Sequence, residues 1–136
     1  MRNKKNTPII KNASYSFLFG GVISLIGQLL IAFNEQMLHL EVKDARSLMT
    51  LQLILVASLL TGLNLYDKIG QIACSGTVIP ITGFANSMTS SAMEYKPEGF
   101  FLGICANVFK LAGSVIACGV FFGIIVSLVR FLGMLI

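Results

Sequence analysis

A semi-polar stretch interrupts an otherwise apolar sequence near the middle of the chain. It runs from Ile72 to Met93, follows the charged Tyr66–Gln71 segment, and contains Pro80 and Gly83. A proline removes one backbone donor and clashes one turn back, so a continuous helix through Pro80 would cost about 3 kcal/mol. In lipid, irregular backbone persists only where protein covers it or where it lines a wet cavity. The stretch therefore predicts a broken helix inside a membrane protein rather than a plain membrane anchor.

The composition supports a single membrane domain over residues 1–136. The chain is 55% hydrophobic and 12% charged, with a mean hydropathy of +0.82, whereas soluble domains are roughly a quarter charged. The net charge of +4 does not predict nucleic-acid binding, because four of the ten basic residues lie in the N-terminal arm at residues 1–13 (Arg2, Lys4, Lys5 and Lys11). Such an arm is typical of a cytoplasmic anchor under the positive-inside rule.

We expect an all-α, polytopic fold with about four membrane segments and with broken or re-entrant helices in the middle. A bilayer core of about 30 Å needs roughly twenty apolar residues in a helix. The expected segments are 14–33, 48–65, 72–93 and 100–133. The polar residues from Asn34 to Ser47 predict a loop on the far side, and two half-helices are expected to meet near Pro80 to Gly83. Four crossings would place both termini on the cytoplasmic face.

The last apolar stretch allows two interpretations. A helix from Phe100 to Ile136 would be about 55 Å long, far more than one membrane thickness. Lys110 and Arg130 bracket a span from Leu111 to Val129, which would leave residues 100–109 as a re-entrant half-helix. Alternatively, the span covers residues 100–121 and places Lys110 in mid-membrane.

The sequence contains no recognisable catalytic constellation, and we expect no enzyme activity. The carboxylates Asp67, Glu94 and Glu98 are at predicted membrane edges, and the single histidine, His39, is in a polar segment. A nucleophile with an adjacent base is therefore missing. The three cysteines lie apart in apolar segments, so neither a metal site nor another cofactor site is expected.

A solute path is the better functional hypothesis. The N-terminus of a half-helix carries about half a positive charge and attracts anions, and Lys110 would add a full one. The candidate transport residues are Pro80, Thr82, Gly83, Asn86, Ser87 and Lys110, and the candidate charge partners are Asp67, Lys68 and Glu94. The alternative is structural: hydrogen bonding between helices by Thr82, Asn86 and Ser87, and anchoring at the interface by Lys110.

Several motifs carry a resemblance to a known family. They are residues 60–71 (LTGLNLYDKIGQ), 80–88 (PITGFANSM), 94–96 (EYK) and 107–113 (NVFKLAG), with shorter matches at 19–21 and 26–28. The chain resembles, from Phe17 onward, the AC/AE family of stage V sporulation membrane proteins of endospore-forming bacteria. The basic arm and Lys110 favour its AC branch. Where this chain has Cys74-Ser75-Gly76, the family more often has a glycine-alanine-glycine run.

The resemblance implies a place in the forespore and spore inner membrane, in a hetero-oligomeric complex. That complex would move dipicolinic acid with Ca²⁺ into the developing spore and out again at germination. This chain would supply the membrane channel, with membrane tension as a candidate gating stimulus. Its partners would be an AE-type membrane subunit, a soluble AD-type subunit and lipid. A scaffold that only assembles other proteins is the alternative, although a scaffold needs no semi-polar central segment.

Overall fold

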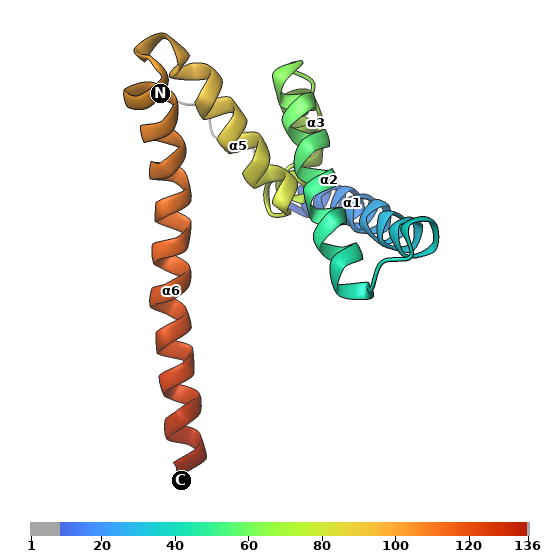
Figure 1. The fold of residues 1–136 in the computed structure, drawn as a ribbon, viewed down its shortest axis with the longest axis vertical. Coiled ribbons are helices and arrows are strands. Elements are labelled where there is room, and N and C mark those ends of the chain that lie inside the picture. Colours follow the sequence, from blue (N-terminus) through green and yellow to red (C-terminus); the bar gives the residue numbers. More distant parts are fainter. Residues whose placement is uncertain (1–8, 136) are drawn as a thin grey trace. The chain divides into compact units, whose positions relative to one another are not determined.

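Every regular element is a helix in the part of the chain that the structure, a computed structural model, describes (residues 9–135). The α-helices are α1 (Ile9–Leu38), α2 (Val42–Gly62), α3 (Tyr66–Ala73), α4 (Ser75–Val78), α5 (Ile81–Glu94) and α6 (Ala106–Leu135) (Figure 1). A 3₁₀-helix, η1 (Lys96–Glu98), and a π-helix, η2 (Phe100–Cys105), precede α6. The expected all-α class is confirmed for these residues. Arg2, Lys4 and Lys5 of the predicted arm lie outside them, whereas Lys11 belongs to α1.

Three helical stretches are long and apolar enough to cross a membrane. They are α1, α2 and the continuous stretch from Phe100 to Met134. The expected fourth segment, residues 72–93, is not confirmed as a span. Within it the longest helix is α5, with 14 residues, because breaks at Cys74 and Pro80 divide the segment.

The first unit of the chain, up to Ser90, is built on the hairpin of α1 and α2. The prediction of a loop from Asn34 to Ser47 is wrong, since α1 continues to Leu38 and α2 begins at Val42. Only three residues connect the helices, and the first of them, His39, has a positive φ of 51°. Charged side chains do not end a helix whose backbone bonds remain satisfied, so the polar pattern marked exposure rather than a loop.

The second span ends three residues earlier than predicted, at Gly62 instead of Leu65. Asn64 has a φ of 57°, and its N–H donates to the Thr61 carbonyl at 2.9 Å. The N–H of Leu65 donates to the Leu60 carbonyl, also at 2.9 Å. This is a Schellman motif, in which asparagine tolerates the left-handed position. The left-handed conformation of Asn64 therefore ends the helix.

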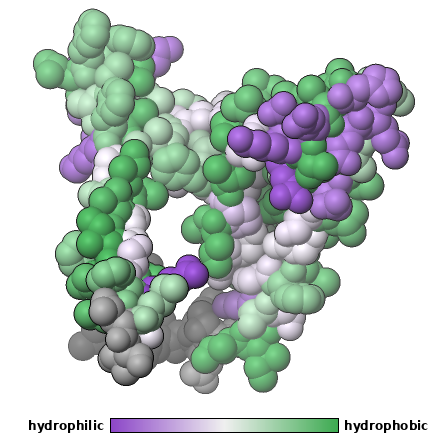
Figure 2. All heavy atoms as spheres, turned by 60° about the horizontal axis from the view of Figure 1, so that its bottom comes forward, coloured by the Kyte–Doolittle hydropathy of each residue, from purple (hydrophilic) through white to green (hydrophobic). Residues whose placement is uncertain are grey.

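Two alanines and one tyrosine form the buried centre of the first unit. Ala57, Tyr66 and Ala85 are buried together, and Ile54 and Leu60 pack against them. Large apolar side chains instead point outward, as Phe17 does with 82% of its surface exposed. Figure 2 shows that hydrophobic side chains cover much of the visible surface. Close packing through small residues with an apolar exterior is typical of helices surrounded by lipid.

The second unit, from Ser91, consists of the end of α5, a tight turn and the long helix. Gly99 has a φ of 96° in this turn, and Gly103 packs so closely against the Tyr95 carbonyl oxygen that a Cβ atom would collide with it. η2 then runs directly into α6, so a separate re-entrant half-helix at residues 100–109 is not confirmed. The 35-residue stretch is about 52 Å long, so it must tilt or extend beyond a bilayer core of about 30 Å.

Candidate functional site

The segment formed by α3, α4 and α5, which we call the interrupted segment, contains two breaks. At the second, α4 ends at Val78 and α5 begins at Ile81, which agrees with the interruption expected near Pro80. The Gly83 N–H donates to the Pro80 carbonyl at 2.9 Å and closes the first turn of α5. The first break was not predicted: it lies at Cys74, whose φ of 52° and ψ of −127° are rare for a residue with a side chain. The sequence offered one signal here, the glycine that the resemblance implies at this position.

Gly83 allows the two sides of the second break to approach each other. A Cβ atom at this position would collide with the carbonyl oxygens of Val78 and Thr77. Glycine carries only a hydrogen atom at this position, so α5 can begin directly against the end of α4. The predicted site residue Gly83 therefore has a defined role in backbone packing.

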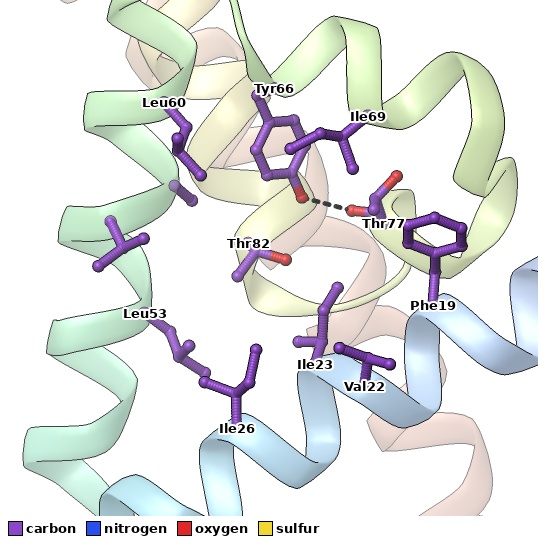
Figure 3. Close-up of a pocket in the computed structure, with 12 residues that line it drawn as sticks. Phe19, Val22, Ile23, Ile26, Leu53, Leu60, Tyr66, Ile69, Thr77 and Thr82 are labelled. Carbon is purple, nitrogen blue, oxygen red and sulfur yellow. Dashed lines mark hydrogen bonds between the residues drawn. The ribbon is translucent and has the colours of Figure 1, made fainter.

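Thr82 faces a cavity of about 270 Å³ in the first unit (Figure 3). The cavity is lined by Phe19, Val22, Ile23, Ile26, Leu53, Val56, Ala57, Leu60, Tyr66, Ile69, Thr77 and Thr82. The Tyr66 hydroxyl donates to the Thr77 carbonyl at 2.7 Å. Thr82 is only 6% exposed, and its hydroxyl oxygen has no hydrogen-bond partner. We call this space the apolar pocket.

Tyr66 is a neutral donor at the edge of the apolar pocket. Burial raises the pKa of its hydroxyl above the ordinary value of 10.0, and the nearby Thr82 hydroxyl offsets part of this increase. A phenol with a raised pKa keeps its proton at physiological pH. The bond from Tyr66 to the Thr77 carbonyl therefore persists and ties the start of α3 to the end of α4.

A second hollow of about 220 Å³ adjoins the break at Pro80. Its lining residues are Ser16, Gly20, Ser24, Ser75, Gly76, Ile79 and Pro80, and we call it the serine groove. Ser16 accepts a hydrogen bond from the Ser75 N–H at 3.2 Å, and the two hydroxyl oxygens are 3.3 Å apart. The sequence prediction missed these serines. The four-residue spacing of Ser16, Gly20 and Ser24, which places them on one helix face, was a usable signal.

Asn86 and Ser87 have partners within the first unit. The Thr61 hydroxyl lies 2.7 Å from the Asn86 side-chain oxygen and 2.8 Å from the Ala57 carbonyl oxygen, and its one proton serves one of them at a time. Ser87 donates to the Gly83 carbonyl at 3.1 Å. The Asn86 contact joins α5 to α2, which is the structural role left open by the sequence.

The charged candidates are exposed. Asp67 and Lys68 lie on the first turn of α3, in the same unit as Pro80 and Thr82. Glu94 ends α5 and Lys110 lies on α6, and both belong to the second unit. Their geometry alone assigns them no specific role.

Comparison with known proteins identifies the family. Residues 12–129 match the SpoVAC/SpoVAEB sporulation membrane proteins. The chain belongs to this family. It is similar to the Stage V sporulation protein AC of Bacillus subtilis (strain 168), with 48% identity over 124 residues, which cover 91% of this chain and 83% of that relative. No solved structure matches. Both breaks, the apolar pocket and the serine groove lie within the region matched to the SpoVAC/SpoVAEB family.

Proposed function

We propose that this chain is a non-enzymatic channel subunit that moves dipicolinic acid, with Ca²⁺, across the inner membrane of the forespore and spore. Family membership supports a membrane role in sporulation. The solute follows from the resemblance of the Pro80–Met88 and Asn107–Gly113 motifs to the AC branch. Uptake during sporulation and release at germination would then use the same path.

The single observation that carries a channel role is the twice-broken segment α3–α5 beside the span-length helices α1 and α2. Each break ends the helical hydrogen-bonding pattern, and the freed backbone groups need protein or water as partners. Transporters and channels use such broken helices at solute sites. A helix hairpin that served only as an anchor would not need this arrangement.

The serine groove is a better candidate path than the apolar pocket. Dipicolinate is a dianion, and burying charge among apolar side chains is strongly unfavourable. The apolar pocket has no charged residue in its lining, whereas the serine groove has three hydroxyl side chains beside the break at Pro80. Lys110, which belongs to the second unit, is a separate candidate cation for the solute.

Two serines on α1 allow a matched test. Ser14 and Ser24 are both exposed and both donate to the carbonyl four residues earlier at 2.9 Å, but only Ser24 lines the serine groove. In spores that depend on this chain, we expect Ser24→Leu to lower dipicolinate content several-fold and Ser14→Leu to leave it near normal. The amount of each variant in the membrane is measured in parallel. Normal content with Ser24→Leu at unchanged protein level would contradict a path through this groove.

A non-conducting scaffold is the second candidate, and α6 favours it. None of the 18 residues in the most apolar part of the Phe100–Met134 stretch is buried, which leaves a long surface for lipid or for other membrane subunits. If the chain is a scaffold, substitutions in the serine groove should not change the dipicolinate content of spores. Loss of the whole chain should instead remove its partner subunits from the membrane. Purified protein in liposomes separates the two roles, because a scaffold alone would not release entrapped dipicolinate.

A further inference from the structure

We propose that the apolar pocket binds one acyl chain of a membrane lipid. This site is separate from the solute path proposed above. Its walls come from α1, α2 and the interrupted segment, all within the first unit.

The lining determines the chemical class of the ligand. Nine of its twelve residues are aliphatic or phenylalanine (Phe19, Val22, Ile23, Ile26, Leu53, Val56, Ala57, Leu60 and Ile69), and none is charged. A charged or strongly polar ligand would lose its hydration without compensation there. An apolar ligand would gain favourable burial, so the pocket selects a hydrocarbon body.

The pocket makes no polar demand on this ligand. The Thr82 hydroxyl oxygen is fully buried and lies close to the Tyr66 hydroxyl, whose own proton is bonded to the Thr77 carbonyl. Figure 3 shows these side chains among the residues that line the pocket. A hydrocarbon chain therefore fills the space without leaving a polar group of its own unpaired.

The size and the surroundings agree with an acyl chain. A cavity of about 150 Å³ can hold benzene, so about 270 Å³ accommodates roughly ten carbon atoms, which is part of one chain. Two walls of the pocket are helices long and apolar enough to cross a membrane, and Val22 and Val56 on these walls are half-exposed. Bilayer lipid is therefore the ligand that these walls would meet.

The absence of tryptophan from the chain provides a direct test. A single tryptophan is placed either at Val56, which lines the pocket and is 50% exposed, or at the adjacent Leu55, which does not line it and is 62% exposed. The purified full-length variants in detergent are titrated with phosphatidylcholine that carries dibrominated acyl chains. We expect saturable quenching of Val56→Trp, reversed by unbrominated lipid, and only gradual, non-saturable quenching of Leu55→Trp. Identical non-saturable curves would overturn the proposal.

The source of the acyl chain is tested with the same Val56→Trp variant, by comparing a free dibrominated fatty acid with the brominated phospholipid. Saturable quenching by the free fatty acid, but not by the phospholipid, would overturn the assignment to membrane lipid.

Discussion

Asn34 of α1 and Gln52 of α2 form a reciprocal pair of hydrogen bonds. Each side-chain amide donates to the oxygen of the other at 3.2 Å, and Asn34 also donates to the Ala45 carbonyl at 3.4 Å. Asn34 is completely buried. Because each amide satisfies a donor and an acceptor of the other, the pair fixes the register of α1 against α2, and thus the walls of the apolar pocket.

Replacing Asn34 with alanine should destabilise the hairpin by about 1–2 kcal/mol, because Gln52 loses a partner in a partly buried place. The single and double alanine variants at Asn34 and Gln52 form a double-mutant cycle, measured by thermal unfolding in detergent. We expect a coupling free energy of about 0.5–1.5 kcal/mol. Strictly additive effects would show that the two amides act independently.

Gly76 should be intolerant of alanine. Its Cβ position lies against the Ser16 carbonyl oxygen and 3.0 Å from the Gly20 backbone nitrogen, so α4 would have to move away from α1. We expect Gly76→Ala to lower stability by about 1–3 kcal/mol and to reduce dipicolinate content in spores. Gly21, on the same helix as Gly20, has no atom within 4 Å of its Cβ position. Gly21→Ala is therefore the control, and an equal loss from both variants would contradict this explanation.

Cys74→Gly should stabilise the first unit. Relief of an unfavourable backbone conformation is worth about 1–3 kcal/mol, and the greater freedom of unfolded glycine offsets about 1 kcal/mol of it. The expected net gain of about 1 kcal/mol is measured as a higher unfolding temperature. Cys118 is the control, because it lies within α6 and a helical glycine should lower stability by up to about 1 kcal/mol. A lower unfolding temperature for Cys74→Gly would count against the assigned conformation.

The two membrane faces are tested by labelling. We expect a cysteine introduced at Glu41, in the connection between α1 and α2, to react with an impermeant reagent from outside, and one at Lys5 to be protected. The background lacks the native Cys74, Cys105 and Cys118. A third cysteine at Gly133, near the end of α6, shows how many times the chain crosses. Protection at Gly133 agrees with the expected four crossings, whereas labelling there would indicate three.

Lys110→Gln separates conduction from anchoring. The substitution keeps hydrogen bonding and deletes the charge, so we expect reduced dipicolinate accumulation at an unchanged protein level if Lys110 attracts the anion. Arg130→Gln changes the other cation of α6 and should have a much smaller effect. Normal accumulation and release with Lys110→Gln would leave Lys110 as an interface anchor.

The pattern of apolar residues determined much of the architecture. Residues 14–33 and 48–65 lie largely within α1 and α2, and Pro80 marked a real break, because a proline acts on its own backbone wherever it is placed. Polar residues were less informative. Those around residues 34–47 belong mostly to helices, since side-chain polarity reports exposure and does not by itself end a helix.

Only the tertiary structure decided which side chains meet. Ser16 and Ser75 are 59 residues apart in sequence, yet they share the serine groove. Thr61 and Asn86 pair across α2 and α5, and Thr82 becomes a buried hydroxyl only when α1 and α2 close around it. The sequence by itself determined the long apolar helices and the break at Pro80, because local backbone preferences and hydrophobicity govern them, and its motifs determined the family. The pocket, the groove and the partner of each polar group depend on contacts between distant segments, which no local pattern specifies.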